Sequence, residues 1–339
     1  MVSVVCIYSK DGLIGRIAED FLSQGAELHL WALDGIAPSA SRWTHGVGPG
    51  DKMTNLNRLF PYFRDSERVL FTDDDIEFPP NFLNNFLSAV DEFGLELAQP
   101  ALSHESAHTF PHTLVRPDLL VRETNWVEQM VFTMSREMIQ QVMPIPEDFW
   151  MGWGMEMIWE KVARENGWKT GIIDRTPVHH RTRAISSRYD AKKASTSMLT
   201  ALERSGLSWV PMRTLCAFSD GRECSWVPAS TARFITTLSK IAAAAKPLDN
   251  SKNASTDGSI VETIPPPLRD YWRMAHLVYK EVYSAFSDDA EIAALFEDEG
   301  KAEERKRFLI DFFSIVSEHR AEDAILRAWL SSRVGLAEI

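Results

Sequence analysis

The chain has 339 residues, of which 45% are hydrophobic and 25% are charged, and its formal net charge is -12 at pH 7. This length and apolar content are sufficient for one large domain with a smaller one attached. The acidic balance speaks against non-specific binding of nucleic acids, because such binding requires a basic surface to displace counterions from the phosphates.

The N-terminal third alternates between strand and helix patterns. Strands are expected over residues 2–8, 27–33 and 68–72, and helices over residues 14–24 and 52–63. This alternation predicts an α/β domain with a mostly parallel, Rossmann-like sheet flanked by helices. In such sheets ligands bind beyond the carboxyl ends of the strands.

The remaining elements follow in a less regular order. The patterns favour helices over residues 80–90 and 155–166, strands over residues 95–100 and 169–173, and an antiparallel element from residues 114–123 and 128–134. After about residue 189 strand signals fade and helix formers dominate. We therefore expect an α/β domain over 1–195, a helical extension over 196–246, a flexible linker over 247–266 and an α-helical C-terminal domain over 267–339.

The number of cysteines and the length of the apolar runs are indicators of the cellular location. Cys6, Cys216 and Cys224 lack the spacing of a metal site, and so few cysteines suit a reducing compartment. The apolar runs are shorter than the roughly 20 residues of a spanning helix. We expect a cytoplasmic protein. The helix expected over 234–245 is flanked by basic residues and suggests peripheral contact with the inner face of a membrane, with packing on the protein core as the alternative. The oligomeric state is not indicated.

An acidic triplet, Asp73-Asp74-Asp75, comes directly after the strand expected over residues 68–72. Adjacent carboxylates raise one another's pKa unless a cation compensates their charge, and a hard divalent ion does so. Alternate side chains of an extended segment share a face, so Asp73 and Asp75 are expected to point to one site and Asp74 away from it. The alternative is a solvated acidic turn.

Two further segments of the chain are informative together with this triplet. They are Phe149-Trp150-Met151-Gly152-Trp153-Gly154-Met155-Glu156, and Ile173-Asp174 followed by Pro177-Val178 and His180. The triplet resembles the DxD motif of GT-A glycosyltransferases, and the second segment resembles the WGWGxE stretch of beta-1,4-galactosyltransferases. All three in this order resemble a group of predicted bacterial and plant glycosyltransferases. The resemblance covers about residues 1 to 190.

This resemblance implies a GT-A fold and a divalent metal, Mn²⁺ or Mg²⁺, bound with the diphosphate of a nucleotide-sugar. Asp75 would be a direct metal ligand, and Asp73 would lie near the metal or the ribose. His180 would be the late metal ligand, with His179 as its rival.

The same resemblance implies the other roles in the site. Glu156 would be the catalytic base, although the galactosyltransferases have a second acidic residue where this chain has Met157. Asp34 would contact the nucleobase or ribose. Lys52 and Asn55 would lie near the nucleotide, which is also where we place Trp153, whose flat face suits a sugar ring.

The predicted function is therefore that of a metal-dependent inverting glycosyltransferase. A single carboxylate base implies direct displacement, with a UDP- or GDP-linked sugar as donor and a glycan or glycolipid as acceptor, as in polysaccharide biosynthesis. The alternatives are a metal-dependent phosphohydrolase or nucleotidyltransferase, and a non-catalytic module that binds nucleotide-sugars.

Two further features complete the expected site. Glu128 lies between apolar residues, where an unpaired carboxylate is costly, so it either binds a sugar hydroxyl or pairs with Arg116 or Arg122. Gly152 and Gly154 have no side chain, and we expect them to let a sugar approach the backbone.

Overall fold

A computed structural model describes residues 2–108, 110–116, 118–181, 189–208, 210 and 212–224. The chain divides into two compact units, one formed by Met1–His108 with Thr113–Trp226 and the other by Thr109–His112 with Val227–Ile339. The second unit lies almost entirely outside the described residues, as do the predicted linker, the C-terminal helical domain and the helix over 234–245. The fold below is that of the first unit.

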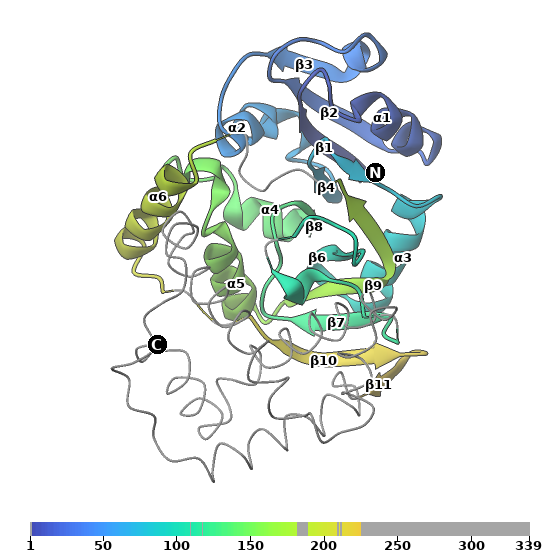
Figure 1. Cartoon of the computed structure of the whole chain (residues 1–339). Coiled ribbons are helices and arrows are strands. Elements are labelled where there is room, and N and C mark those ends of the chain that lie inside the picture. Colours follow the sequence, from blue (N-terminus) through green and yellow to red (C-terminus); the bar gives the residue numbers. More distant parts are fainter. Residues whose placement is uncertain are drawn as a thin grey trace, which may run out of the picture. The chain divides into compact units, whose positions relative to one another are not determined.

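The first unit is built on one mixed sheet with the strand order β11-β10-β7-β9-β6-β8-β4-β1-β2-β3 (Figure 1). The strands are β1 (Val2–Tyr8), β2 (Glu27–Ala32), β3 (Thr44–Val47), β4 (Arg68–Thr72), β5 (Ile76–Glu77), β6 (Leu95–Leu102), β7 (Val121–Thr124), β8 (Val131–Ser135), β9 (Lys169–His180), β10 (Thr214–Ser219) and β11 (Arg222–Cys224). The short strand β5 lies off this order and pairs with β9.

Helices cover both faces of the sheet. They are α1 (Ile14–Ser23), α2 (Lys52–Phe63), α3 (Phe82–Phe93), α4 (Arg136–Val142), α5 (Met155–Asn166) and α6 (Ala191–Arg204), with 3-10 turns η1 (Pro38–Trp43), η2 (Pro111–Thr113) and η3 (Trp150–Gly152). In Figure 1, α1 and α3 lie on the right of the sheet and α2, α4, α5 and α6 on its left. The expected mixed α/β architecture is therefore confirmed for the described residues.

The sheet is parallel mainly in its N-terminal half. β1 runs parallel to β2 and β4, and β2 runs parallel to β3. Beyond β4 the sheet is mixed, because β8 is antiparallel to β4 and β6 and β7 is antiparallel to β9 and β10, whereas β6 and β9 are parallel. The expected sheet is thus found as a mixed sheet with a parallel N-terminal half. Periodicity reports which residues are apolar but not which strand becomes the neighbour.

Two segments that were expected to pair with each other belong to distant strands. Residues 114–123 and 128–134 contribute to β7 and β8, which β9 and β6 separate in the sheet. β7 is instead antiparallel to β9 and β10. The loop between β7 and β8 therefore crosses from the outer part of the sheet to its centre. On its way it passes the carboxyl end of β4, where the amide of Asp73 donates to the carbonyl of Met130 (3.1 Å).

The region after residue 189 contains strands as well as the expected helix. β10 and β11 form a hairpin that extends the sheet beyond β7. Its turn is Asp220-Gly221, with φ values of 49° and 72°, as in the tight hairpin turns that suit sheet twist. The α/β unit thus continues past residue 196, and the Asp-Gly pair was the sequence signal for it.

Local signals in the sequence account for the helix positions. Buried residues Ile14, Ile17, Ala18 and Phe21 form one apolar face of α1, at the spacing that places side chains on one side of a helix. The carboxylate of Asp51 accepts hydrogen bonds from the backbone amides of Met53 (3.0 Å) and Thr54 (3.1 Å) and caps α2. This cap fixes where α2 begins, and so where Lys52 lies.

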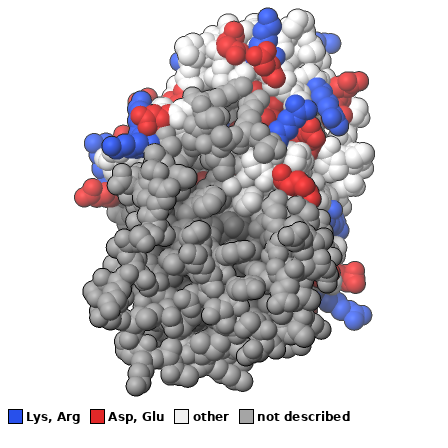
Figure 2. Space-filling view, in the orientation of Figure 1, with Lys and Arg blue, Asp and Glu red and all other residues white. Residues whose placement is uncertain are grey.

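No helix of the described part is suited to span a membrane, and the charges on the face drawn in Figure 2 are mixed. None of its helices has both the length and the apolar content needed to cross a bilayer. On the face drawn in Figure 2, Lys and Arg side chains lie beside Asp and Glu over the described residues, so the charges there are mixed.

Candidate functional site

The acidic triplet is joined to the end of β9 by a two-residue ladder. Ile76 of β5 pairs with His180 of β9, and Glu77 pairs with His179. The amide of Arg181 also donates to the carbonyl of Asp75 (3.1 Å). These backbone contacts bring together two segments that are far apart in the sequence.

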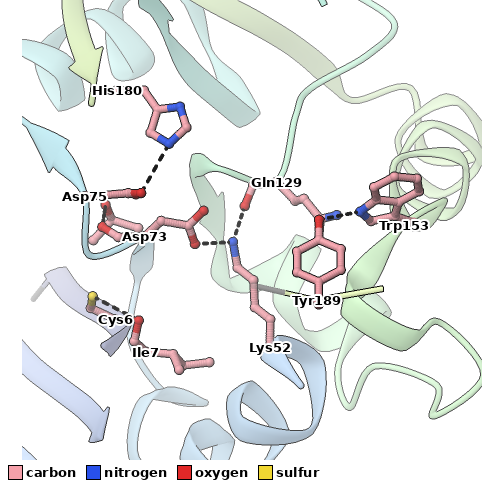
Figure 3. A network of polar contacts seen from close by, with 10 residues as sticks. Cys6, Ile7, Lys52, Asp73, Asp75, Gln129, Trp153, His180 and Tyr189 are labelled. Atoms are coloured by element: carbon pink, nitrogen blue, oxygen red, sulfur yellow. Dashed lines mark hydrogen bonds and ion pairs between the residues drawn. The ribbon is translucent and has the colours of Figure 1, made fainter. Parts of the chain in front are cut away.

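His180 and Asp75 face each other at this junction (Figure 3). The Nε2 atom of His180 lies 3.4 Å from Oδ2 of Asp75. Its Nδ1 lies 2.7 Å from the carbonyl of Ala107, and because a carbonyl only accepts, Nδ1 carries the proton. Burial lowers the pKa of His180, but the Asp75 carboxylate and the Ala107 carbonyl outweigh it and the net shift is upward. His179 points elsewhere, with Nδ1 3.0 Å from the hydroxyl of Ser103.

Asp73 is held by a lysine at the start of α2. The ammonium of Lys52 donates to Oδ1 of Asp73 and to the carbonyl of Gln129, at 2.6 Å each, as Figure 3 shows. The Asp73 side chain retains 38% exposure. Burial nevertheless raises its pKa, against the opposing effect of Lys52. The expected neighbourhood of Lys52 and Asp73 is thus a direct ion pair.

Asp74 turns away from the other two carboxylates. It is buried, and its Oδ2 accepts a hydrogen bond from the amide of Ser9 (2.7 Å). A β-carbon at Gly12 would come within 2.2 Å of this oxygen. Asp74 therefore stabilises the turn between β1 and α1, where a residue larger than Gly12 does not fit.

The residues around Asp75 fit a divalent cation with two protein ligands. Among the described residues, no group of three or more His, Cys, Asp or Glu side chains is arranged to hold a metal ion, since Asp73 faces Lys52. Adjacent ligand atoms around an octahedral ion with bonds of about 2.1 Å lie about 3 Å apart, close to the spacing of Asp75 and His180. The Ala107 carbonyl fixes the imidazole with Nε2 toward the site, as outer partners of metal-binding histidines do. Phosphate oxygens and water would complete the shell.

Glu156 lies in the first turn of α5 and is only 5% exposed. Its Oε2 accepts a hydrogen bond from the amide of Gly154 (3.1 Å). Burial raises the pKa of Glu156 to about 7, although these backbone amides and Lys52 act in the opposite direction. A carboxyl with such a pKa is present in both protonation states at neutral pH, which is what a general base requires.

Glu128 is a second buried carboxyl on the loop between β7 and β8, with 8% exposure. Its backbone amide donates to Oε1 of Gln99 (2.5 Å), whereas its own Oε2 has no hydrogen-bond partner among the described residues. Burial, and next the charge of Glu156, raise its pKa to about 8, while His180 and Lys52 lower it. Glu128 is therefore neutral at pH 7.

Arg122, one of the two arginines that we considered as a partner of Glu128, belongs to another cluster. Arg122 donates from Nε to Oδ2 of Asp174 (2.8 Å) and from Nη2 to its Oδ1 (3.0 Å). Both side chains are fully buried, and Oδ1 also accepts from the amide of Arg116 (2.8 Å). Pairing of Glu128 with Arg122 is thus wrong, and Asp174 joins β9 to β7 and to the segment before it.

The tryptophans of the Gly-rich loop belong to an aromatic cluster. Nε1 of Trp153 donates to the hydroxyl of Tyr189 (3.1 Å), as Figure 3 shows. The Tyr189 ring stands edge-on to Trp153 and to Trp150, with centroids 6.3 and 5.9 Å away. The Lys193 ammonium lies 4.2 Å from the centre of the Trp150 ring. Trp153 is therefore oriented by Tyr189 and lies on the loop that leads into α5, which carries Glu156.

The glycines of this loop make room for protein side chains. Gly152 and Gly154 have φ values of 82° and 93°, which other residues rarely adopt. A β-carbon at Gly152 would come within 2.0 Å of Oε1 of Gln129, and one at Gly154 within 2.8 Å of Cγ of Met198. Neighbouring side chains occupy the space where a β-carbon would lie at both glycines, and the approach of a sugar to their backbone stays a prediction.

Two residues expected at the nucleotide serve loops in the structure. Asn55 is fully buried, and its side chain contacts the carbonyl of Gly50 (3.3 Å) and Nη1 of Arg58 (2.7 Å). It stabilises the loop before α2, and its expected place near the nucleotide stays a prediction. Asp34 is exposed after β2, and its Oδ1 accepts from the amide of Lys10 (2.7 Å).

The three sequence segments meet around the loop that carries Glu128. The amide of Asp73 donates to the carbonyl of Met130 on this loop, Gly152 lies beside the side chain of Gln129, and His180 is joined to the acidic triplet through Asp75. No pattern in the sequence indicated the role of the Gln129 carbonyl, because every residue has a backbone carbonyl. Tyr189 was missed because an isolated tyrosine carries no motif.

Comparison with known proteins gives structural neighbours only. No protein-family model matches the chain, and no curated protein matches it in sequence. A crystal structure of GalNAc-T7 with UDP, GalNAc and Mn²⁺ is similar over 60% of this chain, with 9% identity and a TM-score of 0.44, and the match covers 47% of that protein. The inositol-1-phosphate CTP transferase from T. maritima matches 61% of this chain and 98% of its own length, with 12% identity and a TM-score of 0.32.

Proposed function

We propose that this chain is a metal-dependent inverting glycosyltransferase of GT-A fold. It transfers a sugar from a UDP- or GDP-linked donor to a hydroxyl of a glycan or glycolipid. The observation that carries this proposal is that Lys52 binds both Asp73 of the acidic triplet and the carbonyl of Gln129, whose side chain lies beside Gly152 on the loop leading to the buried Glu156, while Asp75 pairs with His180. Following the sequence resemblance, we place the reaction in polysaccharide biosynthesis on the cytoplasmic side of a membrane.

One end of the site suits the leaving group. Asp75 and His180 would hold Mn²⁺ or Mg²⁺, which neutralises charge on a diphosphate when bound. Lys52 adds a fixed positive charge on the same side, through Asp73 and the carbonyl of Gln129. Because Lys52 already has two acceptors, its charge is held in place before any substrate arrives.

The other end of the site suits the acceptor. Glu156, with a pKa of about 7, takes the proton from the acceptor hydroxyl as that oxygen attacks the anomeric carbon. Glu128, with a pKa of about 8, is neutral at pH 7 and so is a poor nucleophile. A single ionised carboxylate supports direct displacement with inversion, in which no sugar becomes attached to the protein.

A thermal-shift screen of nucleotide-sugars with and without Mn²⁺ tests the donor half of the proposal. A ligand that binds the native state raises the apparent stability, so the matching donor should raise the Tm only when metal is present. Asp75→Asn should abolish the metal-dependent part of the shift. An equal shift in that variant, or a shift that ignores the metal, would contradict the site assignment.

Product analysis separates the proposed reaction from its alternatives. The matching donor incubated with a mixture of glycan and glycolipid acceptors should yield a new glycoside of inverted anomeric configuration. A product limited to free sugar or sugar phosphate would indicate a hydrolase. Release of inorganic diphosphate from a nucleoside triphosphate and a sugar phosphate would indicate a nucleotidyltransferase.

A further inference from the structure

The side chain of Glu128 is the feature that the proposed reaction leaves unused. It is 92% buried, since 8% of the residue is exposed, yet its Oε2 has no hydrogen-bond partner among the described residues. A buried polar atom without a partner is costly in a native protein. Such an atom in a candidate active site indicates a partner that arrives with the substrate.

The loop that carries Glu128 is fixed at several points. The amide of Glu128 donates to Oε1 of Gln99, and the carbonyl of the next residue, Gln129, accepts from Lys52. The hydroxyl of Thr124 donates to the carbonyl of Trp126 (2.8 Å) at the start of the loop. Because the backbone is held on both sides of Glu128, its carboxyl is directed by the fold and is not a mobile surface group.

Contacts of the next residue, Gln129, locate the loop of Glu128 between the two ends of the site. The carbonyl of Gln129 accepts from Lys52, which also binds Asp73, and the side chain of Gln129 lies beside Gly152 on the loop that leads to Glu156. Asp73, Lys52 and His180 belong to the end proposed for the diphosphate, and Glu156 to the end proposed for the acceptor hydroxyl. The group that lies between a leaving diphosphate and an attacking hydroxyl is the sugar of the donor.

We infer that Glu128 is a positioning residue that recognises the donor sugar through a hydrogen bond between its carboxyl group and a ring hydroxyl. This inference rests on the proposed function and names the part of the substrate that Glu128 contacts. The carboxyl is in its neutral form at pH 7, so its O–H donates to a sugar oxygen while its carbonyl oxygen remains an acceptor. A neutral Glu128 also leaves Glu156 as the member of this pair of carboxyls that takes up a proton.

Two variants at this position separate the hydrogen bond from packing. Glu128→Gln keeps the size, one donor and one acceptor without the charge. Glu128→Ala removes all of them, and it also removes a buried acid without a partner, so it should not impair folding. Glu123→Ala is the matched control, because Glu123 lies on β7 with its carboxylate 3.4 Å from Nζ of Lys169, outside the site.

The experiment compares binding of the nucleotide-sugar with binding of the same nucleotide diphosphate alone, in the presence of Mn²⁺, by calorimetry. In the wild-type chain the sugar should strengthen binding. Glu128→Ala should weaken nucleotide-sugar binding by about tenfold and leave the nucleotide alone unaffected. Glu128→Gln and Glu123→Ala should retain the sugar's contribution.

A pH series adds a readout that a purely structural role would not change. Raising the pH from 7 to 9 should weaken sugar recognition in the wild-type chain, because Glu128 loses its donor proton, but should leave recognition in Glu128→Gln as it was. Equal contributions of the sugar in wild type and Glu128→Ala, with normal nucleotide binding, would overturn the inference alone. Failure of the wild-type chain to bind any nucleotide diphosphate in the presence of metal would overturn the proposed function, and the inference with it.

Discussion

Two buried clusters of charge in this unit are built in opposite ways. In the first, the fully buried Asp174 is matched by two hydrogen bonds from Arg122 and one from the backbone amide of Arg116. In the second, Glu128 and Glu156 lie close enough to affect each other, and neither has a cation in hydrogen-bond contact among the described residues. In the first cluster the charge of Asp174 is matched by that of Arg122, whereas in the second burial raises the pKa values of Glu128 and Glu156 to about 8 and about 7, so that both exchange protons near neutral pH.

This difference separates stability from chemistry within one sheet. Asp174 and His180 both lie on β9, only a few residues apart, and both belong to the third sequence motif. Asp174 joins β9 to β7 from the inside of the unit, and His180 faces Asp75 at the end of the strand. Perturbed carboxyls without a structural partner are the better indicators of a functional site.

Replacement of Glu156 should have the largest effect on the reaction. Glu156→Gln keeps the shape and the hydrogen bond from Gly154 but cannot accept a proton. Transfer should fall by about 100- to 10,000-fold, as is usual when a general base is removed. Donor binding should be retained, which calorimetry on the same protein checks. Transfer at the wild-type rate would assign the base to another group.

Replacement of Arg122 should have the largest effect on stability. Arg122→Met leaves the buried Asp174 without its cation, and breaking such a pair by removing one partner costs about 3–5 kcal/mol. Urea unfolding measures this loss. The double variant Arg122→Met, Asp174→Leu should recover much of it, because the isolated charge is gone. A single variant as stable as the wild type would contradict the contrast between the two clusters.

The alternating N-terminal half and its caps were readable from the sequence. Strands β1, β2 and β4 and helices α1 and α2 follow from apolar periodicity, and Asp51 caps α2 through the short-range contact that its residue type favours. β10 and β11 were missed, because a strand at the outer part of a sheet depends on the neighbour that it pairs with. The predicted linker over 247–266 and the C-terminal domain over 267–339 lie outside the described residues and remain predictions.

The site was only partly readable from the sequence. The three motifs located Asp75, Glu156 and His180, since each motif marks the end of a strand or the start of a helix. The choice between His179 and His180 required the pairing of β5 with β9, and a two-residue strand has no sequence signature. The placement of Asn55 near the nucleotide stays a prediction, and the loop contacts of its side chain could not be read from the sequence because only the folded chain defines that loop.

The two adjacent histidines offer a matched pair of variants at the metal end. His180→Ala should weaken metal-dependent binding of the nucleotide by about 10- to 100-fold, because one of two protein ligands is lost. His179→Ala should bind as the wild type does, since its ring contacts Ser103 and points away from Asp75. Titration with Mn²⁺ at fixed nucleotide measures both. Weaker binding in His179→Ala than in His180→Ala would exchange their roles.

The smallest expected effect is on how stability depends on pH. Glu128 has a pKa of about 8 in the folded chain and near 4.5 when unfolded, so between these values the folded state binds the proton that the unfolded state has lost. The favourable contribution is therefore complete below about pH 4.5 and is lost as the pH rises through about 8. Between pH 5 and 9 the free energy of unfolding of the wild type should fall by about 1–2 kcal/mol relative to that of Glu128→Gln. This is less than the full difference between the two pKa values would give, because the structure relaxes and lets solvent reach the ionised carboxylate. Because the ionised form of Glu156 helps to raise the pKa of Glu128, Glu156→Gln should move the fall in stability to lower pH. A fall at the same pH in the wild type and in Glu156→Gln would show that the two carboxyls are not coupled.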